Sequence, residues 1–168
     1  MATTNFQEYF NHYIKQVDSL EPVMALEETQ KEFITLLEKV DDEKGLFCYD
    51  EGKWSIKEVV SHIIDAERVF AYRAMSFARN DQNDLAGFDD HLYTKNSGAN
   101  NRSMEELLAE FDIVRKASIA LYGSFDEAMW ARTGTANGIT IDVKSLAYLI
   151  AGHSRHHGNI LLERYLVD

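Results

Sequence analysis

Two histidines near the end of the chain have the spacing of a metal-binding pair. His153 and His157 are four residues apart, in a segment whose apolar residues recur with helical periodicity. At about 100° per residue, both imidazoles point to the side of the helix that carries Leu146, Ile150 and Ile160. Imidazoles on an apolar face lose hydration, and a metal ion would offset that loss. Neutral imidazole is a good ligand for zinc, nickel, copper and iron.

The pair alone also fits a simpler interpretation, in which the histidines are hydrogen-bonded within an ordinary core. His62 lies at the edge of the apolar face of another expected helix, where a boundary histidine is the commoner case. His156 points about 100° away from His157 and therefore flanks the pair. His91 lies in a long loop, where it is either a fourth ligand or a solvated side chain.

Four amphipathic segments predict an all-α protein, an antiparallel four-helix bundle. The expected helices span residues 22–40, 55–79, 103–122 and 142–166. Capping boxes that begin at Ser55 and Ser103, and a cap at Asp142, mark three of the helix starts. We expect a short extra helix in the first twenty residues and a loop or short hairpin over residues 133–141.

Residues 80–101 form a long connection between the second and third expected helices. Antiparallel neighbouring helices are usually joined by shorter connections, and long loops in compact domains are often functional. A mixture of aromatic and acidic residues at 87–93 predicts a short helix over one end of the bundle. The role of this connection stays open from the sequence.

Composition narrows the class of protein. The 168 residues predict one domain over residues 1–168, and a net charge of −11 without a basic cluster argues against nucleic acid and anionic membranes. No apolar run is long enough for a membrane span, and the first residues lack a signal-peptide pattern. Cys48 is the only cysteine, so no intrachain disulfide forms. We expect a cytoplasmic protein that handles a small molecule.

Three stretches in this order resemble the DinB-like family of four-helix-bundle metalloproteins. They are Gly52–Arg68, Gly87–Asp89 and Ala151–His157, the last followed by Leu162–Tyr165. The resemblance extends from about Tyr13 to Tyr165. It implies a divalent metal site with His62 from the second helix and His153 and His157 from the fourth, and none of the three is replaced here.

Three neutral protein ligands would leave an open coordination position, which is typical of catalytic rather than structural zinc. A metal there would lower the pKa of a bound water or thiol. Zinc or nickel suits three imidazoles best, and iron or manganese is also compatible. The resemblance adds a low-molecular-weight thiol as a co-substrate, because the wider superfamily includes thiol-dependent transferases and isomerases. Homodimers are common among similar proteins, so a homodimer is one expected assembly.

Further residues are candidates for orienting the ligands or contacting a substrate, namely Asp65, Arg73, Asp89, Tyr93 and His156. Asp65 lies about 60° from His62 around the helix, but it also fits an ordinary surface carboxylate. Arg73 shares the direction of His62 and would hold either an anionic substrate group or an acidic partner at the core edge. Asp89 and Tyr93 would cover the metal from the long loop, or be solvated there.

The sequence leaves three functions open. The first is a metal-dependent thiol (S-)transferase or related hydrolase that acts on a small molecule. The second is a non-catalytic metal- or ligand-binding protein of stress response or sensing. The third is a structural bundle with fortuitous histidines. Neither a nucleophile–base pair nor a glycine-rich phosphate loop is visible, so the sequence does not decide whether the protein is an enzyme.

Overall fold

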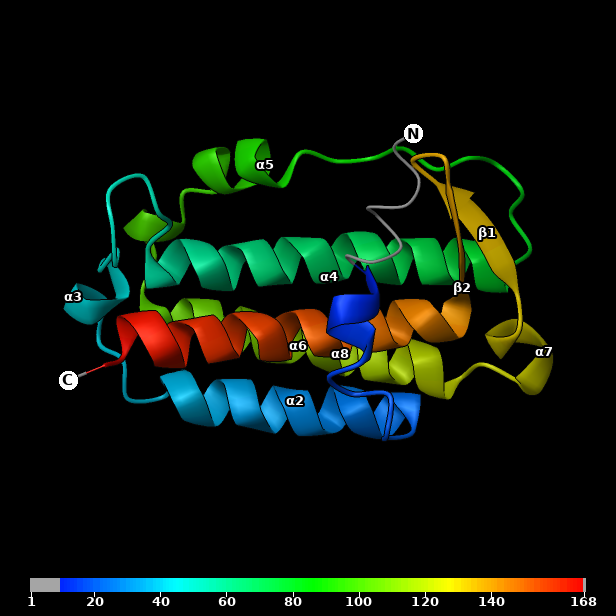
Figure 1. The fold of residues 1–168 in the computed structure, drawn as a ribbon, viewed down its shortest axis with the longest axis horizontal. Coiled ribbons are helices and arrows are strands. Elements are labelled where there is room, and N and C mark those ends of the chain that lie inside the picture. The colour runs from blue at the N-terminus through cyan, green and yellow to red at the C-terminus, as the bar shows by residue number, and fades with distance from the viewer. Residues whose placement is uncertain (1–9, 168) are drawn as a thin grey trace.

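A computed structural model describes residues 10–167 of the chain. Figure 1 shows four long helices packed side by side, with short elements at both ends. The long helices are α2 (Pro22–Leu37), α4 (Ile56–Ala78), α6 (Met104–Gly123) and α8 (Val143–Ile160). The prediction of an all-α four-helix bundle is confirmed. In the described range, no helix has both the length and the hydropathy needed to cross a lipid bilayer.

Side-chain caps fix the starts of three long helices where the sequence predicts them. The Ser55 hydroxyl accepts the Glu58 backbone N–H at 3.1 Å, and the Glu58 carboxylate accepts the Ser55 N–H at 2.8 Å. Ser103 and Glu106 form the same capping box, with distances of 3.1 and 2.9 Å. Asp142 caps α8. These bonds satisfy backbone donors that have no partner inside the helix.

The helix ends differ slightly from the predicted ones. Helix α2 ends at Leu37 rather than residue 40, because the chain turns into the short helix α3 (Asp42–Gly45), which Asp41 caps. Helix α8 is α-helical to Ile160 and continues as the π-helical turn η2 (Leu161–Tyr165). Residues 10–14 of the predicted leading helix are helical and residues 15–19 form turns, while residues 1–9 lie outside the described residues.

Short elements fill the connections. They are α5 (Asp90–Asn96), the 3-10 turn η1 (Ala99–Asn101), α7 (Glu127–Trp130), β1 (Thr133–Ala136) and β2 (Ile139–Asp142). The two strands pair in antiparallel register, with Thr133 opposite Asp142, so the expected loop or hairpin at 133–141 is a hairpin. Its turn residues, Asn137 and Gly138, both have positive φ, as a type I′ two-residue hairpin turn requires.

The helices form a ring in which each has one parallel and one antiparallel neighbour. Helix α2 packs against α8 and α6, and α4 packs against the same two. In Figure 1, α2 and α8 run in one direction while α4 and α6 run in the other. The antiparallel pairs are therefore α4–α8 and α2–α6. The pairs α2/α4 and α6/α8 are consecutive along the chain but lie on opposite sides of the ring, whereas α4 and α6 are neighbours.

The long connection at 80–101 explains this arrangement. In Figure 1 it leaves the end of α4, runs back along the bundle, carries α5 and reaches the end at which α4 began. The next helix, α6, therefore starts beside the start of α4 and runs parallel to it. A short turn would have produced an antiparallel neighbour instead.

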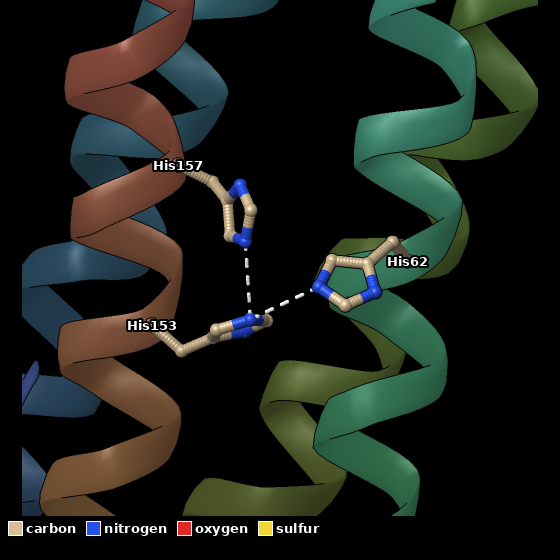
Figure 2. Close-up of side chains that lie close together, drawn as sticks. All are labelled: His62, His153 and His157. Carbon is tan, nitrogen blue, oxygen red and sulfur yellow. Dashed lines mark hydrogen bonds between the residues drawn. The ribbon is translucent and has the colours of Figure 1, made fainter. Parts of the chain in front are cut away.

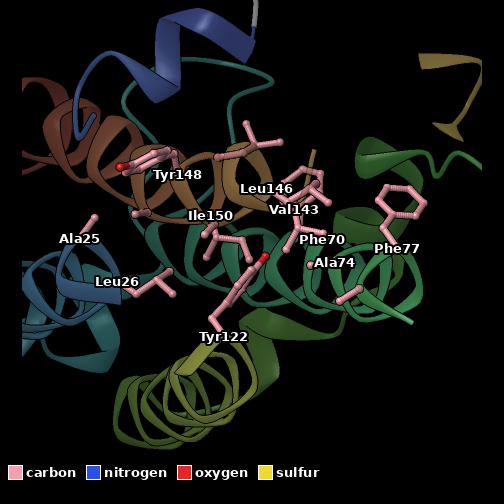
Figure 3. Close-up of a cluster of buried hydrophobic side chains, with 14 of the residues drawn as sticks. Ala25, Leu26, Phe70, Ala74, Phe77, Tyr122, Val143, Leu146, Tyr148 and Ile150 are labelled. Atoms are coloured by element: carbon pink, nitrogen blue, oxygen red, sulfur yellow. The ribbon is translucent and has the colours of Figure 1, made fainter. Parts of the chain in front are cut away.

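The core consists of two apolar clusters separated by a polar layer. Figure 3 shows the first cluster, which includes Leu26, Phe70 and Leu146. The second includes Phe33, Ile63, Phe111 and Leu161. Each long helix passes from one cluster to the other at a buried polar residue, and these residues are Thr29, Glu67, Arg115 and Ser154.

The segment before α2 packs tightly on α8 at Gly152. A Cβ atom there would lie 2.1 Å from the backbone oxygen of Tyr13, whereas one at Gly158 would meet only side chains at 3.7 Å. We expect Gly152→Ala to lower the free energy of unfolding by about 1–3 kcal/mol through overpacking. Gly158→Ala should raise it by up to about 1 kcal/mol, because alanine favours the helix. Urea denaturation measures both, and equal effects would contradict the close packing.

Candidate metal centre

Three histidines from two neighbouring helices converge on one point. His62 projects from α4, and His153 and His157 project from α8 (Figure 2). The Nε2 atom of His153 lies 3.0 Å from that of His62 and 3.1 Å from that of His157. Ligand nitrogens of all three rings lie within 4.8 Å of one another. The antiparallel packing of α4 on α8 brings together residues that are far apart in the sequence.

The donor set fits a divalent cation. One Nε2 proton can bridge only two of the three nitrogens, so hydrogen bonds among the rings cannot satisfy all of them. Zn–N bonds of about 2.0–2.1 Å place two tetrahedral ligands about 3.3–3.4 Å apart, near the observed separations. His62 and His153 are each 6% exposed, so water does not readily supply the hydrogen bond that the remaining nitrogen lacks.

The imidazoles are in the form that binds metal. Burial lowers the pKa of His62 to about 4, although the charge of Asp90 acts in the opposite direction. Burial and the neighbouring histidines lower the pKa of His157 to about 3 and that of His153 well below its usual value. All three rings are therefore neutral at pH 7, with lone pairs free for a metal ion.

Aromatic rings surround the three histidines. The Trp54 ring lies 4.8 Å from the His62 ring, measured between ring centroids, and the His91 ring lies 5.2 Å from the Trp54 ring. The Tyr13 ring lies 5.5 Å from His153. His91 is exposed and lies outside the three-nitrogen cluster, so the structure places it against Trp54.

A cavity of about 280 Å³ opens beside the histidines. Its walls come from α4 and α8, and it is covered by the start of the described chain, by residues 87–90 and by the β1–β2 hairpin. The lining residues are Phe10, Tyr13, His62, Ala66, Phe70, Arg73, Gly87, Phe88, Asp90, Ala136, Asn137, Ile139, Ile141, Leu146, Leu149 and His153. Such a small, mainly apolar space beside a polar centre suits a small organic ligand.

The other candidate residues on α4 lie in different places. Arg73 lines the cavity and is buried. Asp65 instead pairs with Arg68 at 3.6 Å, and burial raises the pKa of its carboxyl. Asp65 does not line the cavity. On α8, His156 is half-buried, with its ring 5.3 Å from that of His157, and it contributes no nitrogen to the cluster.

The long connection contributes a different carboxylate from the expected one. Asp89 caps α5 by accepting the Leu92 backbone N–H at 2.9 Å, and Tyr93 is exposed. Neither residue lines the cavity, whereas Asp90 does. The sequence pattern marked this acidic stretch but not which of its two aspartates turns inward, because the cap at Asp89 decides that orientation.

A buried ion pair next to the histidines was also missed from the sequence. Arg115 on α6 is fully buried, and its Nε lies 2.8 Å from the Glu67 carboxylate on α4. Its Nη1 donates to the Leu26 carbonyl oxygen and to the Thr29 hydroxyl on α2, at 2.9 and 2.8 Å. Its Nη2 donates to the hydroxyl of Ser154, the residue after His153, at 3.1 Å. One guanidinium thus joins all four helices.

The fold and the site together define a helical-bundle protein with a three-histidine candidate metal centre beside a small cavity. The sequence profile of the DinB superfamily matches residues 25–161, which is most of the chain. The chain therefore belongs to the DinB superfamily. No protein of curated function matches its sequence.

Two solved structures share the fold. YfiT from Bacillus subtilis, described as a probable metal-dependent hydrolase with an unusual four-helix bundle topology, superposes with a TM-score of 0.77. It is 18% identical, over 89% of this chain and 85% of YfiT. A mycothiol-dependent maleylpyruvate isomerase has a TM-score of 0.68 and 12% identity, over 83% of this chain. This chain spans 58% of the isomerase's length.

Proposed function

We propose that His62, His153 and His157 hold a divalent metal ion, and that the protein is a metal-dependent hydrolase or thiol transferase for a small molecule. The observation that carries the proposal is the convergence of three neutral, buried imidazoles at the edge of a cavity. A bound metal with an open position would supply a hydroxide or thiolate near neutral pH.

The other residues of the cavity have roles that fit this chemistry. Asp90 is the only carboxylate among the described residues that line it, and it lies close enough to His62 to influence the pKa of that ring. Its carboxylate oxygens would accept the proton of an entering water or thiol. Phe70 and Phe88 form apolar walls that limit access of bulk water.

The described activities of the two structural neighbours support both branches of the proposal. YfiT is described as a probable hydrolase, and a hydrolase uses water as its nucleophile. The isomerase is described as dependent on mycothiol, which is a small thiol. Zinc or nickel is the proposed metal, because both suit three imidazole ligands. A cytoplasmic location, where low-molecular-weight thiols are reduced, is part of the same proposal.

Two reactions on the metal-loaded protein test the function. Hydrolysis of p-nitrophenyl acetate tests activation of water, and conjugation of glutathione or cysteine to 1-chloro-2,4-dinitrobenzene tests activation of thiol. We expect metal-dependent turnover of at least one kind, lost in His153→Ala and retained in the matched control His156→Ala. Bound metal without any turnover would instead favour the non-catalytic binding protein.

A further inference from the structure

Arg73 is a buried cation that has no acidic partner among the described residues. Its side chain is 8% exposed, and its Nη2 donates to the Ala86 carbonyl oxygen at 3.0 Å. Its Nε is buried and has no hydrogen-bond partner in the described part of the chain. Among residues 10–167, no carboxylate oxygen lies within 4.0 Å of its guanidinium. A buried charge that lacks these partners lowers the stability of the fold unless a ligand completes its hydrogen bonds.

Two other shielded arginines in the described chain, Arg115 and Arg155, have acidic partners. Arg115 has Glu67 and neutral acceptors around its guanidinium, and Arg155 donates to both Glu28 and Glu32 at 2.8 Å. Burial lowers the pKa of Arg73, and no acidic group of the described residues offsets this, although an arginine remains charged at neutral pH. Of the two buried arginines among the described residues, only Arg73 therefore lacks an acidic partner.

That place is the cavity beside the histidines. Arg73 lines the same cavity as His62 and His153. Long side chains on a helix point back toward its N-terminus, which directs Arg73 toward the histidine end of α4. The Phe70 ring lies 6.3 Å from the His153 ring and 5.9 Å from the Arg73 guanidinium carbon, so it is close to both groups. Phe88 lies 6.0 Å from the guanidinium on the covering loop.

We propose that Arg73 binds the carboxylate of a small apolar or aromatic acid, whose reacting end then lies at the histidine cluster. The proposal rests on the proposed function and names the substrate class for that site. The free Nε edge of a planar guanidinium matches the two oxygens of a carboxylate. The carboxylate of Asp90 acts on His62 and would repel an anionic group placed near that histidine. It therefore favours the orientation in which the carboxylate of the ligand lies at Arg73.

A carboxylate fits this cavity better than a phosphate. Arg73 is the only lysine or arginine among its described lining residues, so the cavity offers one unit of positive charge outside the histidines. The remaining walls near Arg73 are apolar, with Phe70, Phe88 and Leu146 among them. A singly charged acid with an apolar body matches both the charge and the walls.

Binding of two matched probes tests the proposal on the full-length protein. Phenylacetate carries the carboxylate, and phenylacetamide is its neutral counterpart. Titrations followed by protein NMR should be run with zinc-loaded and chelator-treated protein. In the metal-free protein, we expect phenylacetate to bind at least about 10-fold more tightly than phenylacetamide, in line with a charged hydrogen-bonded pair.

Variants of α4 identify the residue responsible. Arg73→Gln should abolish the preference for phenylacetate and leave the affinity for phenylacetamide unchanged. Arg79→Gln, an exposed arginine after the end of the same helix, should behave as wild type. Arg73→Lys keeps the charge without the planar edge and should reduce the phenylacetate preference several-fold. If Arg73→Gln does not fold, the Arg73→Lys variant tests the proposal in its place.

Two outcomes would overturn the proposal. One is equal affinity of the wild-type protein for both probes, and the other is a phenylacetate preference that survives in Arg73→Gln or is unchanged in Arg73→Lys. Phenylacetate binding that appears only with zinc and persists without Arg73 would place the carboxylate at the histidine site instead. The metal-free titration separates the two proposals, because an Arg73-dependent preference stands even if the protein proves to bind no metal.

Discussion

Replacement of His62, His153 or His157 by alanine is expected to reduce the affinity for Zn²⁺ by more than about 100-fold. Loss of an outer hydrogen-bond partner of a ligand already reduces metal affinity by about 10- to 100-fold, and loss of a ligand should exceed that. Each histidine supplies one of the three nitrogens that converge among the described residues. Competition with a chromophoric chelator measures the affinities.

His156→Ala is the matched control. Its ring lies 5.3 Å from that of His157 on the same helix, yet it has no nitrogen in the cluster. We expect its Zn²⁺ affinity to stay within a few-fold of wild type. An equal loss in His156→Ala, or full affinity in His153→Ala, would contradict the three-histidine site.

Metal binding should also stabilise the wild-type fold. A ligand that binds only the folded state at 100 times its Kd adds about 2.7 kcal/mol to the free energy of unfolding. The ion would join α4 to α8, because its ligands come from both helices. Zn²⁺ should therefore raise the unfolding midpoint of wild type and of His156→Ala, but not that of His153→Ala.

The histidine site shows what periodicity can and cannot reveal. The spacing of His153 and His157 places both rings on one face of a helix, and this is visible from the sequence alone. His62 is 91 residues away from His153, and only the register of α4 against α8 brings them together. The family resemblance connected these residues, because helical periodicity contains no information about register between helices.

Helical periodicity likewise could not predict the order of the helices around the ring. An apolar stripe shows which face of a helix is buried, but not which helix covers it. The length of the 80–101 connection was the available signal, since a chain that returns along the whole bundle needs many residues. The same connection supplies Asp90, whose inward position depends on the cap at Asp89.

The charged residues of the polar layer occupy buried-face positions that can be recognised in the sequence. A search for apolar residues alone overlooks them. Arg115 lies four residues after Phe111 and three before Ser118, on the buried face of α6. Glu67 occupies the corresponding place on α4, four residues after Ile63 and three before Phe70. A charged residue in such a position predicts a buried partner of opposite charge. Identifying that partner requires knowing that α4 and α6 are parallel neighbours.

Replacement of Arg115 by methionine is expected to lower the free energy of unfolding by about 3–5 kcal/mol, because it leaves the Glu67 carboxylate buried without a cation. Urea denaturation followed by circular dichroism measures the change. Arg68→Gln is the control, since Arg68 is half-exposed and pairs with Glu110 at the surface. Its effect should stay below about 1 kcal/mol.

The double variant Glu67→Met with Arg115→Met separates the charge from the packing. Thr29 and Ser154 keep acceptors in their own helices, at 2.8 Å to Ala25 and 2.9 Å to Ala151, so neither hydroxyl is stranded. With the unpaired carboxylate also removed, the double variant should be more stable than Arg115→Met alone. A double variant less stable than Arg115→Met would show instead that the polar layer acts mainly through packing. Either result would also bear on the histidine site, since Ser154 joins this layer directly beside His153 in α8.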